Sequence, residues 1–161
     1  MHWQLVAECL RQELVEYGAL LRLFEQQQES LFKRDADAVL SFGGEIEAQA
    51  YILQDCRVRR EQKVIEFAAE FGLPETTTLR GLLPHVELDA QPLLEALINE
   101  INHLLHRVRR TSRHNHTLLS RTLELHQETL RQLRPDAFAN TYAPNGRLAL
   151  AHGASALRAA G

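Results

Sequence analysis

One group of side chains has a spacing that could hold a metal ion. Glu100 and His103 form a Glu-x-x-His pair, the helical motif of di-iron bundles, and His106 follows one turn later. Such a site needs a second Glu-x-x-His on a facing helix, and the sequence has none, although Glu13 and Glu45 could lie opposite the first. The arginines beside these histidines also disfavour a bound cation. We therefore predict no metal site and no cofactor.

Catalytic signatures are likewise missing from the sequence. It contains no HExxH, no P-loop, no GxSxG and no dinucleotide fingerprint. The two cysteines, Cys9 and Cys56, make neither a zinc motif nor a disulfide framework, and we expect buried, reduced thiols at both positions. We predict a protein that is not an enzyme and has no catalytic residues.

The first residues of the chain lack the basic start and apolar stretch of a signal peptide. No run approaches the roughly 18 apolar residues of a membrane span. We therefore expect a cytoplasmic protein without a membrane span.

The charges are distributed unevenly along the chain. Residues 1–100 hold 18 acidic and 9 basic side chains, whereas residues 101–161 hold 3 acidic and 9 basic ones. The segment from Ile101 to Leu123 has five arginines and no acid. This Arg-rich face could pair with the acidic helices of the same molecule, or it could bind a partner such as nucleic acid. Because the helix lacks aromatic residues for base stacking, we predict no nucleic-acid partner. A nucleic-acid-binding or regulatory coiled-coil protein is the alternative function.

The elements that position these side chains are three long amphipathic helices, expected at about 3–32, 36–71 and 90–133. Their apolar residues repeat in steps of three and four, the spacing of helices that pack along a seam. Asp35 is a candidate N-cap for the second helix, and Gly72 with Pro74 ends it. Gly43-Gly44 marks a kink or a close approach of another backbone. The seams are Leu10, Leu14, Tyr17, Leu21, Phe24, Gln28 and Leu31 in the first helix; Val39, Phe42, Ile46, Gln49, Leu53, Cys56, Arg60, Val64, Phe67 and Phe71 in the second; and Leu94 to Leu125 in the third.

This pattern predicts an all-α fold, an elongated antiparallel three-helix coiled-coil-like bundle with a flexible or partly helical C-terminal tail. The bundle is expected to comprise residues 1–134 and the tail residues 135–161. Between the second and third helices, residues 74–88 read as a linker with one short helical turn around Leu79 and Leu82. Leftover seam surface could also pair two copies, so a homodimer remains open.

Asn115 belongs to both seams of the third helix. A buried Asn can fix helix register at a cost in stability. It could equally offer a polar contact to a partner helix, and the sequence leaves both interpretations open.

Two segments after this point carry a family resemblance. The segment 115–119 reads Asn-His-Thr-Leu-Leu, and the segment 141–146 reads Thr-Tyr-Ala-Pro-Asn-Gly. With the preceding helical hairpin, they resemble the Asn-x-x-Leu-Leu patch and the Tyr-Gly-Pro-x-Gly element of the FlgN family of flagellar export chaperones. Ala143 stands where the family usually has Gly, and Thr111 or Ser112 stands where it has an earlier Asn.

The resemblance implies a cytosolic type III flagellar export chaperone. Such a protein binds the C-terminal helices of the flagellar hook-associated proteins that join hook and filament, prevents their premature assembly and delivers them to the flagellar export gate. It implies that Tyr142 contacts the gate, with Pro144 and Gly146 forming the turn. The candidate client-binding residues are Asn115, Leu118, Leu119, Leu148, Leu150 and Leu157.

Overall fold

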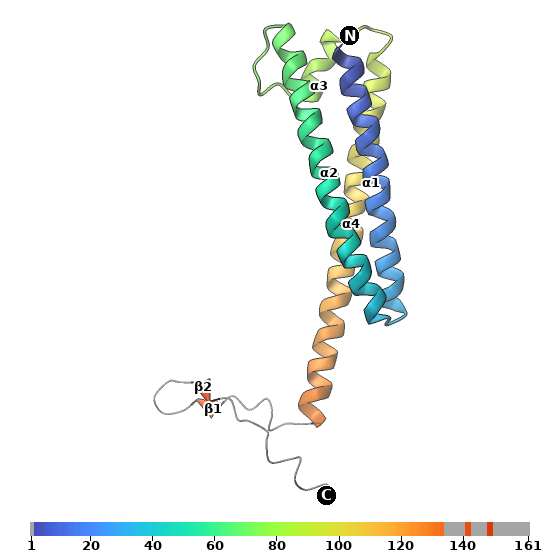
Figure 1. Ribbon diagram of the computed structural model, residues 1–161, viewed down its shortest axis with the longest axis vertical. Coiled ribbons are helices and arrows are strands. Elements are labelled where there is room, and N and C mark those ends of the chain that lie inside the picture. The colour runs from blue at the N-terminus through green and yellow to red at the C-terminus, as the bar shows by residue number, and fades with distance from the viewer. Residues whose placement is uncertain (1, 134–140, 143–147, 150–161) are drawn as a thin grey trace, which may run out of the picture. The chain divides into compact units, whose positions relative to one another are not determined.

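The computed structural model describes residues 2–133, 141–142 and 148–149, and it confirms the predicted all-α fold class (Figure 1). The chain consists of two compact units, Met1–His116 and Thr117–Gly161. The elements are α1 (His2–Phe32), α2 (Ala36–Glu70), the one-turn α3 (Leu79–Leu82), the 3-10 turn η1 (Leu83–His85), α4 (Gln91–Leu133), and the strands β1 (Thr141–Tyr142) and β2 (Leu148–Ala149). The strands pair antiparallel, with Thr141 opposite Ala149 and Tyr142 opposite Leu148.

A three-residue turn folds α2 back along α1. The Asp35 carboxylate accepts a 3.1 Å hydrogen bond from the backbone N–H of Ala38, which confirms the predicted N-cap. Arg34 takes a positive φ of 56° to reverse the chain. Contacts then run in opposite directions along the two helices: Gln27 donates to the Val39 carbonyl near the turn. His2 pairs with Glu70 at the far end, so the two helices are antiparallel.

The end of α2 confirms one prediction and corrects another. Gly72 has a φ of 63°, and the N–H of Leu73 reaches the Ala68 carbonyl at 3.0 Å, which is a Schellman C-cap. Phe71 was expected on the core seam, and that assignment is wrong: it is the C-cap residue and 46% exposed. Because the helix stops at Glu70, the Phe71 ring leaves the seam and lies 4.9 Å from the His85 ring.

One apolar cluster holds the unit Met1–His116 together. It joins buried side chains of α1, α2 and α4, among them Leu10, Phe67 and Leu94. Leu82 and Val86 belong to the same cluster and are almost fully buried. The segment 74–88 is therefore more than a linker, because its apolar side chains are part of the core.

Polar contacts fix α4 against α1 in the same unit. Arg107 approaches Glu25 at 3.4 Å, and the Gln28 amide nitrogen lies 2.9 Å from Nδ1 of His114. The Phe32 ring, in the last residue of α1, makes an edge contact with the His114 ring. Arg107 lies beside Glu25 and, farther along both helices, His114 lies beside Phe32, so α4 runs parallel to α1 in this unit.

Neither glycine of the pair in α2 lies against another backbone: the nearest atom to a Cβ at Gly43 would be the Gln27 amide nitrogen, at 3.7 Å. The helix is continuous through Gly43 and Gly44, and a Cβ at Gly44 would meet nothing within 4 Å. The prediction of a close backbone approach at this point is wrong. Among the helices that the structure describes, none has a stretch apolar and long enough to cross a membrane.

Candidate functional site

The candidate site lies on the last part of α4 and is built from the same repeat that builds the core. Earlier in the helix, Leu94, Leu97, Ile98, Ile101 and Val108 are buried in the cluster shared with α1 and α2. At 3.6 residues per turn, these side chains occupy one side of the helix. This side of the helix contributes to the core that also contains side chains of α1 and α2.

The repeat continues after His116, and there its leucines are exposed. The steps from Leu119 to Leu123, then to His126, Leu130 and Leu133, are four, three, four and three residues. The four leucines have exposed fractions between 40% and 73%. Large apolar side chains in a regular exposed row mark an interaction surface rather than ordinary surface leucines.

A second row widens this surface. Leu118 is half-buried and Leu125, one heptad later, is 67% exposed. The threonines of this row satisfy their hydroxyls locally, since Thr122 donates to the Leu118 carbonyl and Thr129 to the Leu125 carbonyl. Neither hydroxyl needs a partner from outside the helix. We call the two rows together the leucine arc: Leu118, Leu119, Thr122, Leu123, Leu125, His126, Thr129, Leu130 and Leu133.

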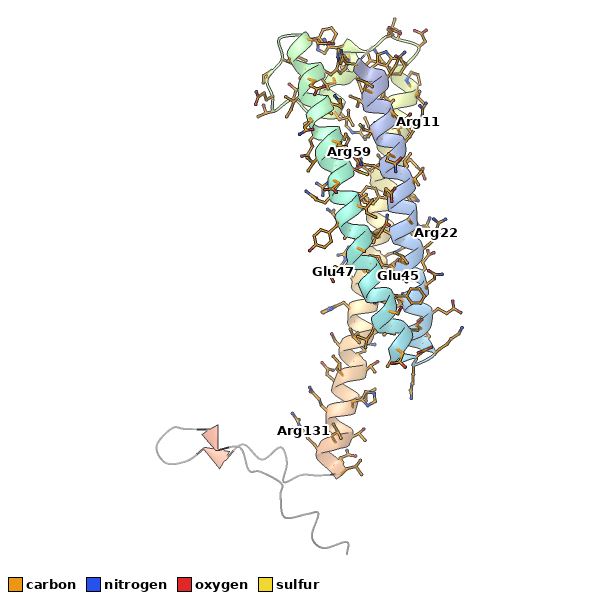
Figure 2. The ribbon with its side chains drawn as sticks, in the orientation of Figure 1. Arg11, Arg22, Glu45, Glu47, Arg59 and Arg131 are labelled. Carbon is orange, nitrogen blue, oxygen red and sulfur yellow. The ribbon has the colours of Figure 1, made fainter. Side chains whose placement is uncertain are left out.

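The leucine arc contains no Lys, Arg, Asp or Glu, and the charged side chains of this segment lie outside it. Arg121, Glu124, Glu128 and Arg131 line a shallow hollow together with Gln127 and with Leu125, at the edge of the arc. Arg131 approaches Glu128 at 3.9 Å and both remain exposed; Figure 2 labels Arg131 on this part of α4. The segment is therefore strongly amphipathic, with one face suited to an apolar partner and one to solvent.

Asn115, which belonged to both predicted seams, is buried and bonded to α1. Its amide nitrogen donates to the Phe24 carbonyl at 2.8 Å and to the Gln27 side-chain oxygen at 3.2 Å. Its own amide oxygen is buried with no hydrogen-bond partner in the described part of the chain. These bonds fix the position of α4 along α1 directly before the leucine arc begins.

The remaining predicted site residues fall partly on described positions. Tyr142 lies in β1 directly opposite Leu148 in β2. Leu150, Leu157, Pro144 and Gly146 lie outside the described residues. Of the predicted client-binding set, Leu118 and Leu119 are the two that the structure places on the leucine arc.

Sequence reasoning missed Leu123, Leu125, Leu130 and Leu133 as site residues. The signal was present, because the four-three repeat runs unbroken to the last turn of α4. The sequence predicted that the first helix ends near residue 32, but it could not show which residues of α4 lie beside that end. In the structure, Phe32 contacts His114 and Asn115 bonds to Phe24, so the repeat of α4 is covered up to this level.

The Arg-rich face lies on the exposed side of α4. His103, His106, Arg107, Arg110 and Arg113 line a shallow hollow. Of these, Arg107 forms an ion pair with Glu25 of α1. The Arg-rich face could therefore attract an acidic partner, although Arg107 is already paired with an acidic side chain of α1.

The candidate metal ligands Glu13, Glu45, Glu100 and His103 do not form a site in the structure. Glu13 is buried in an ion pair with Arg60 of α2, and Glu45 lies on the exposed surface of α2, where Figure 2 labels it. Glu100 and His103 are exposed on α4. Within the described residues, no group of three or more His, Cys, Asp or Glu side chains could hold a metal ion.

The two cysteines line a common hollow between α1 and α2. Burial raises the pKa of the Cys9 thiol, an effect that the nearby Arg59 guanidinium partly opposes. Arg59 also lies 3.5 Å from the sulfur of Cys56. A raised thiol pKa keeps Cys9 protonated and unreactive at neutral pH.

Comparison with known protein families identifies a matching family model. The model described as FlgN protein matches residues 1–149, which include the described helices α1 to α4 and the strands β1 and β2. No curated protein and no solved structure matches the chain.

Proposed function

The chain belongs to the FlgN family of flagellar export chaperones, and from this premise we propose that it captures the C-terminal helices of hook-associated proteins. A free amphipathic helix of such a client exposes apolar surface that promotes premature assembly. The chaperone covers that surface in the helix-in-groove mode until export. The observation that carries the proposal is the leucine arc, in which five leucines of the last part of α4 are exposed to 40% or more.

The bundle serves as the scaffold for this site. We infer that α1, α2 and the first part of α4 form an antiparallel three-helix bundle, supported by the shared core and by the polar contacts of α4 with α1. In this proposal, residues 1–134 act as the bundle domain and residues 135–161 as a tail. Asn115 holds the register of α4, and Leu118 and Leu119 begin the client-binding surface.

The tail completes the proposed function. Leu148, Leu150 and Leu157 add apolar contacts to the client, and Tyr142 presents the complex to the export gate. Tyr142 and Leu148 are partners in the register of β1 and β2, so the two proposed contacts would be neighbours in sequence and in strand pairing. A cytoplasmic location follows from the same role, since clients are met before export.

The experiment is a titration of the purified chain with the C-terminal segment of a hook-associated protein. We expect one client segment per chain, and at least about tenfold weaker binding for the double variant Leu119→Ser/Leu123→Ser, since apolar anchors dominate such interfaces. Leu40→Ser is the matched control, because Leu40 is an exposed leucine of α2. Equal binding by the double variant and the control would remove the leucine arc from the client site.

A second variant tests the tail. A chain ending at residue 139 should keep its helical circular dichroism signal, because every described helix ends by Leu133. We expect its affinity for the client to fall. Undiminished capture would reject the tail as part of the site and leave the arc as the whole of it.

A further inference from the structure

The width of the leucine arc indicates how many helices cover it. Successive residues of an α-helix are about 100° apart around its axis. On this basis the arc, from Leu125 on one edge to Leu123 on the other, spans about 160° of the helix circumference. A strict coiled-coil seam to one partner helix uses a narrower stripe.

The width of the arc can be compared with the width of the buried face earlier in α4. Between Leu94 and Asn115, the at least half-buried positions extend from Thr111 and Leu104 on one edge to Leu105 and Ile98 on the other. This is about 140° by the same helical repeat. Leu104, Leu105 and Ile98 pack in the one cluster that contains side chains of both α1 and α2. The cluster that this face belongs to therefore contains side chains of two other long helices, α1 and α2.

We propose that the client covers the leucine arc with two helices of one chain, and that the complex repeats the packing of α1 and α2 on α4. This inference rests on the proposed function and specifies its partner: a pair of amphipathic helices joined by a turn. Continuity with the α1–α2–α4 interface supports it, because the same repeat of α4 supplies both surfaces.

His126 adds a chemical requirement for the partner. It lies in the Leu119 row, near the middle of the arc, as Asn115 lies in the middle of the covered face three turns earlier. Asn115 meets a backbone carbonyl and a glutamine side chain of α1. The helix that covers His126 must likewise present a hydrogen-bonding group at that level, since a buried ring nitrogen without a partner is costly.

Two matched single variants test the two-helix arrangement. Leu125→Ser changes one edge of the arc and Leu130→Ser a position about 20° from the other edge. Both side chains are exposed in the free chain. We expect each variant to weaken binding of the hook-associated protein's C-terminal segment at least about fivefold, the scale of an interface anchor. Gln127→Ala, on the polar side, should bind as the unchanged chain does.

The outcomes separate the two proposals. Loss of affinity at one edge only means that a single helix binds, which overturns this inference and leaves the chaperone function standing. No loss at either edge, together with no loss for Leu119→Ser/Leu123→Ser, overturns both.

Photo-cross-linking supplies the direct readout. A benzophenone side chain placed at Leu125 or at Leu130 should label two different stretches of the client sequence, separated by a turn. Labelling of one and the same stretch from both positions contradicts the inference. Labelling of a second copy of this chain in the presence of client also contradicts it, because the arc would then be a self-association surface.

Discussion

The Nε of Arg60 donates a 2.5 Å hydrogen bond to the Glu13 carboxylate, which is only 1% exposed. The pair joins α1 to α2 within the core, and the Arg60 side chain keeps about a fifth of its surface exposed. One turn farther along α1, Glu16 accepts two hydrogen bonds from the Gln49 amide of α2, one on its side chain and one on its backbone carbonyl. These polar contacts set the register of the hairpin, because any shift along the seam leaves the Glu13 charge unpaired.

Removal of the arginine should be costly. We expect Arg60→Met to destabilise the chain by about 3 kcal/mol, because it leaves a buried carboxylate without a partner. Urea unfolding followed by circular dichroism measures this. The double variant Glu13→Leu/Arg60→Met should recover most of the loss, since no buried charge remains. A loss below about 1 kcal/mol for the single variant, the range of surface pairs, would contradict the structural role.

Substitution of Gly44 should stabilise the protein. We expect Gly44→Ala to stabilise α2 by about 0.5–1 kcal/mol, because alanine is the better helix former and a Cβ there meets nothing within 4 Å. Thermal unfolding should show a higher midpoint. Gly72→Ala is the control, and it should lower the midpoint because Gly72 has a positive φ of 63°. A destabilising Gly44→Ala would reveal a contact at Gly44.

Asn115 tests whether a structural residue is also a client contact. We expect Asn115→Ala to reduce stability by about 1 kcal/mol through loss of its bonds to Phe24 and Gln27. Affinity for the client, measured well below the unfolding midpoint, should change less than about threefold if Asn115 acts only through register. A collapse of binding with unchanged stability would make Asn115 a direct contact instead.

Tyr142 should separate delivery from capture. We expect Tyr142→Ala to weaken binding of the client-loaded chain to the export gate at least about tenfold, the effect of a tyrosine anchor, while client affinity is preserved. Tyr51→Ala is the matched control, because Tyr51 is an exposed tyrosine on α2. Equal gate binding by both variants, in a surface-plasmon assay, would remove Tyr142 from the gate contact.

Salt dependence distinguishes the chaperone from the nucleic-acid alternative. The leucine arc carries no Lys, Arg, Asp or Glu, so client affinity should change little between 50 and 200 mM salt (concentrations on the order of those that weaken phosphate contacts). Nucleic-acid binding through the Arg-rich face would fall steeply over that range and again on Arg109→Gln/Arg110→Gln. A DNA or RNA mobility shift with this behaviour would revive the alternative.

Local chemistry allowed the sequence to predict the helices and their ends. The four-three repeats give the three long helices, because a helical period is readable wherever one face must be apolar. The Asp35 cap and the Gly72 C-cap follow from side-chain and backbone preferences that act within one turn. The all-α class needed nothing more.

Tertiary structure decided which parts of each repeat are covered. Phe71 was predicted on the seam and is exposed. Leu82 was predicted in a linker and is buried in the core. Leu123 and Leu130 continue the row of buried residues yet are exposed. Burial depends on where the neighbouring helices end in space, and the repeat of a single helix carries no information about its neighbours' ends.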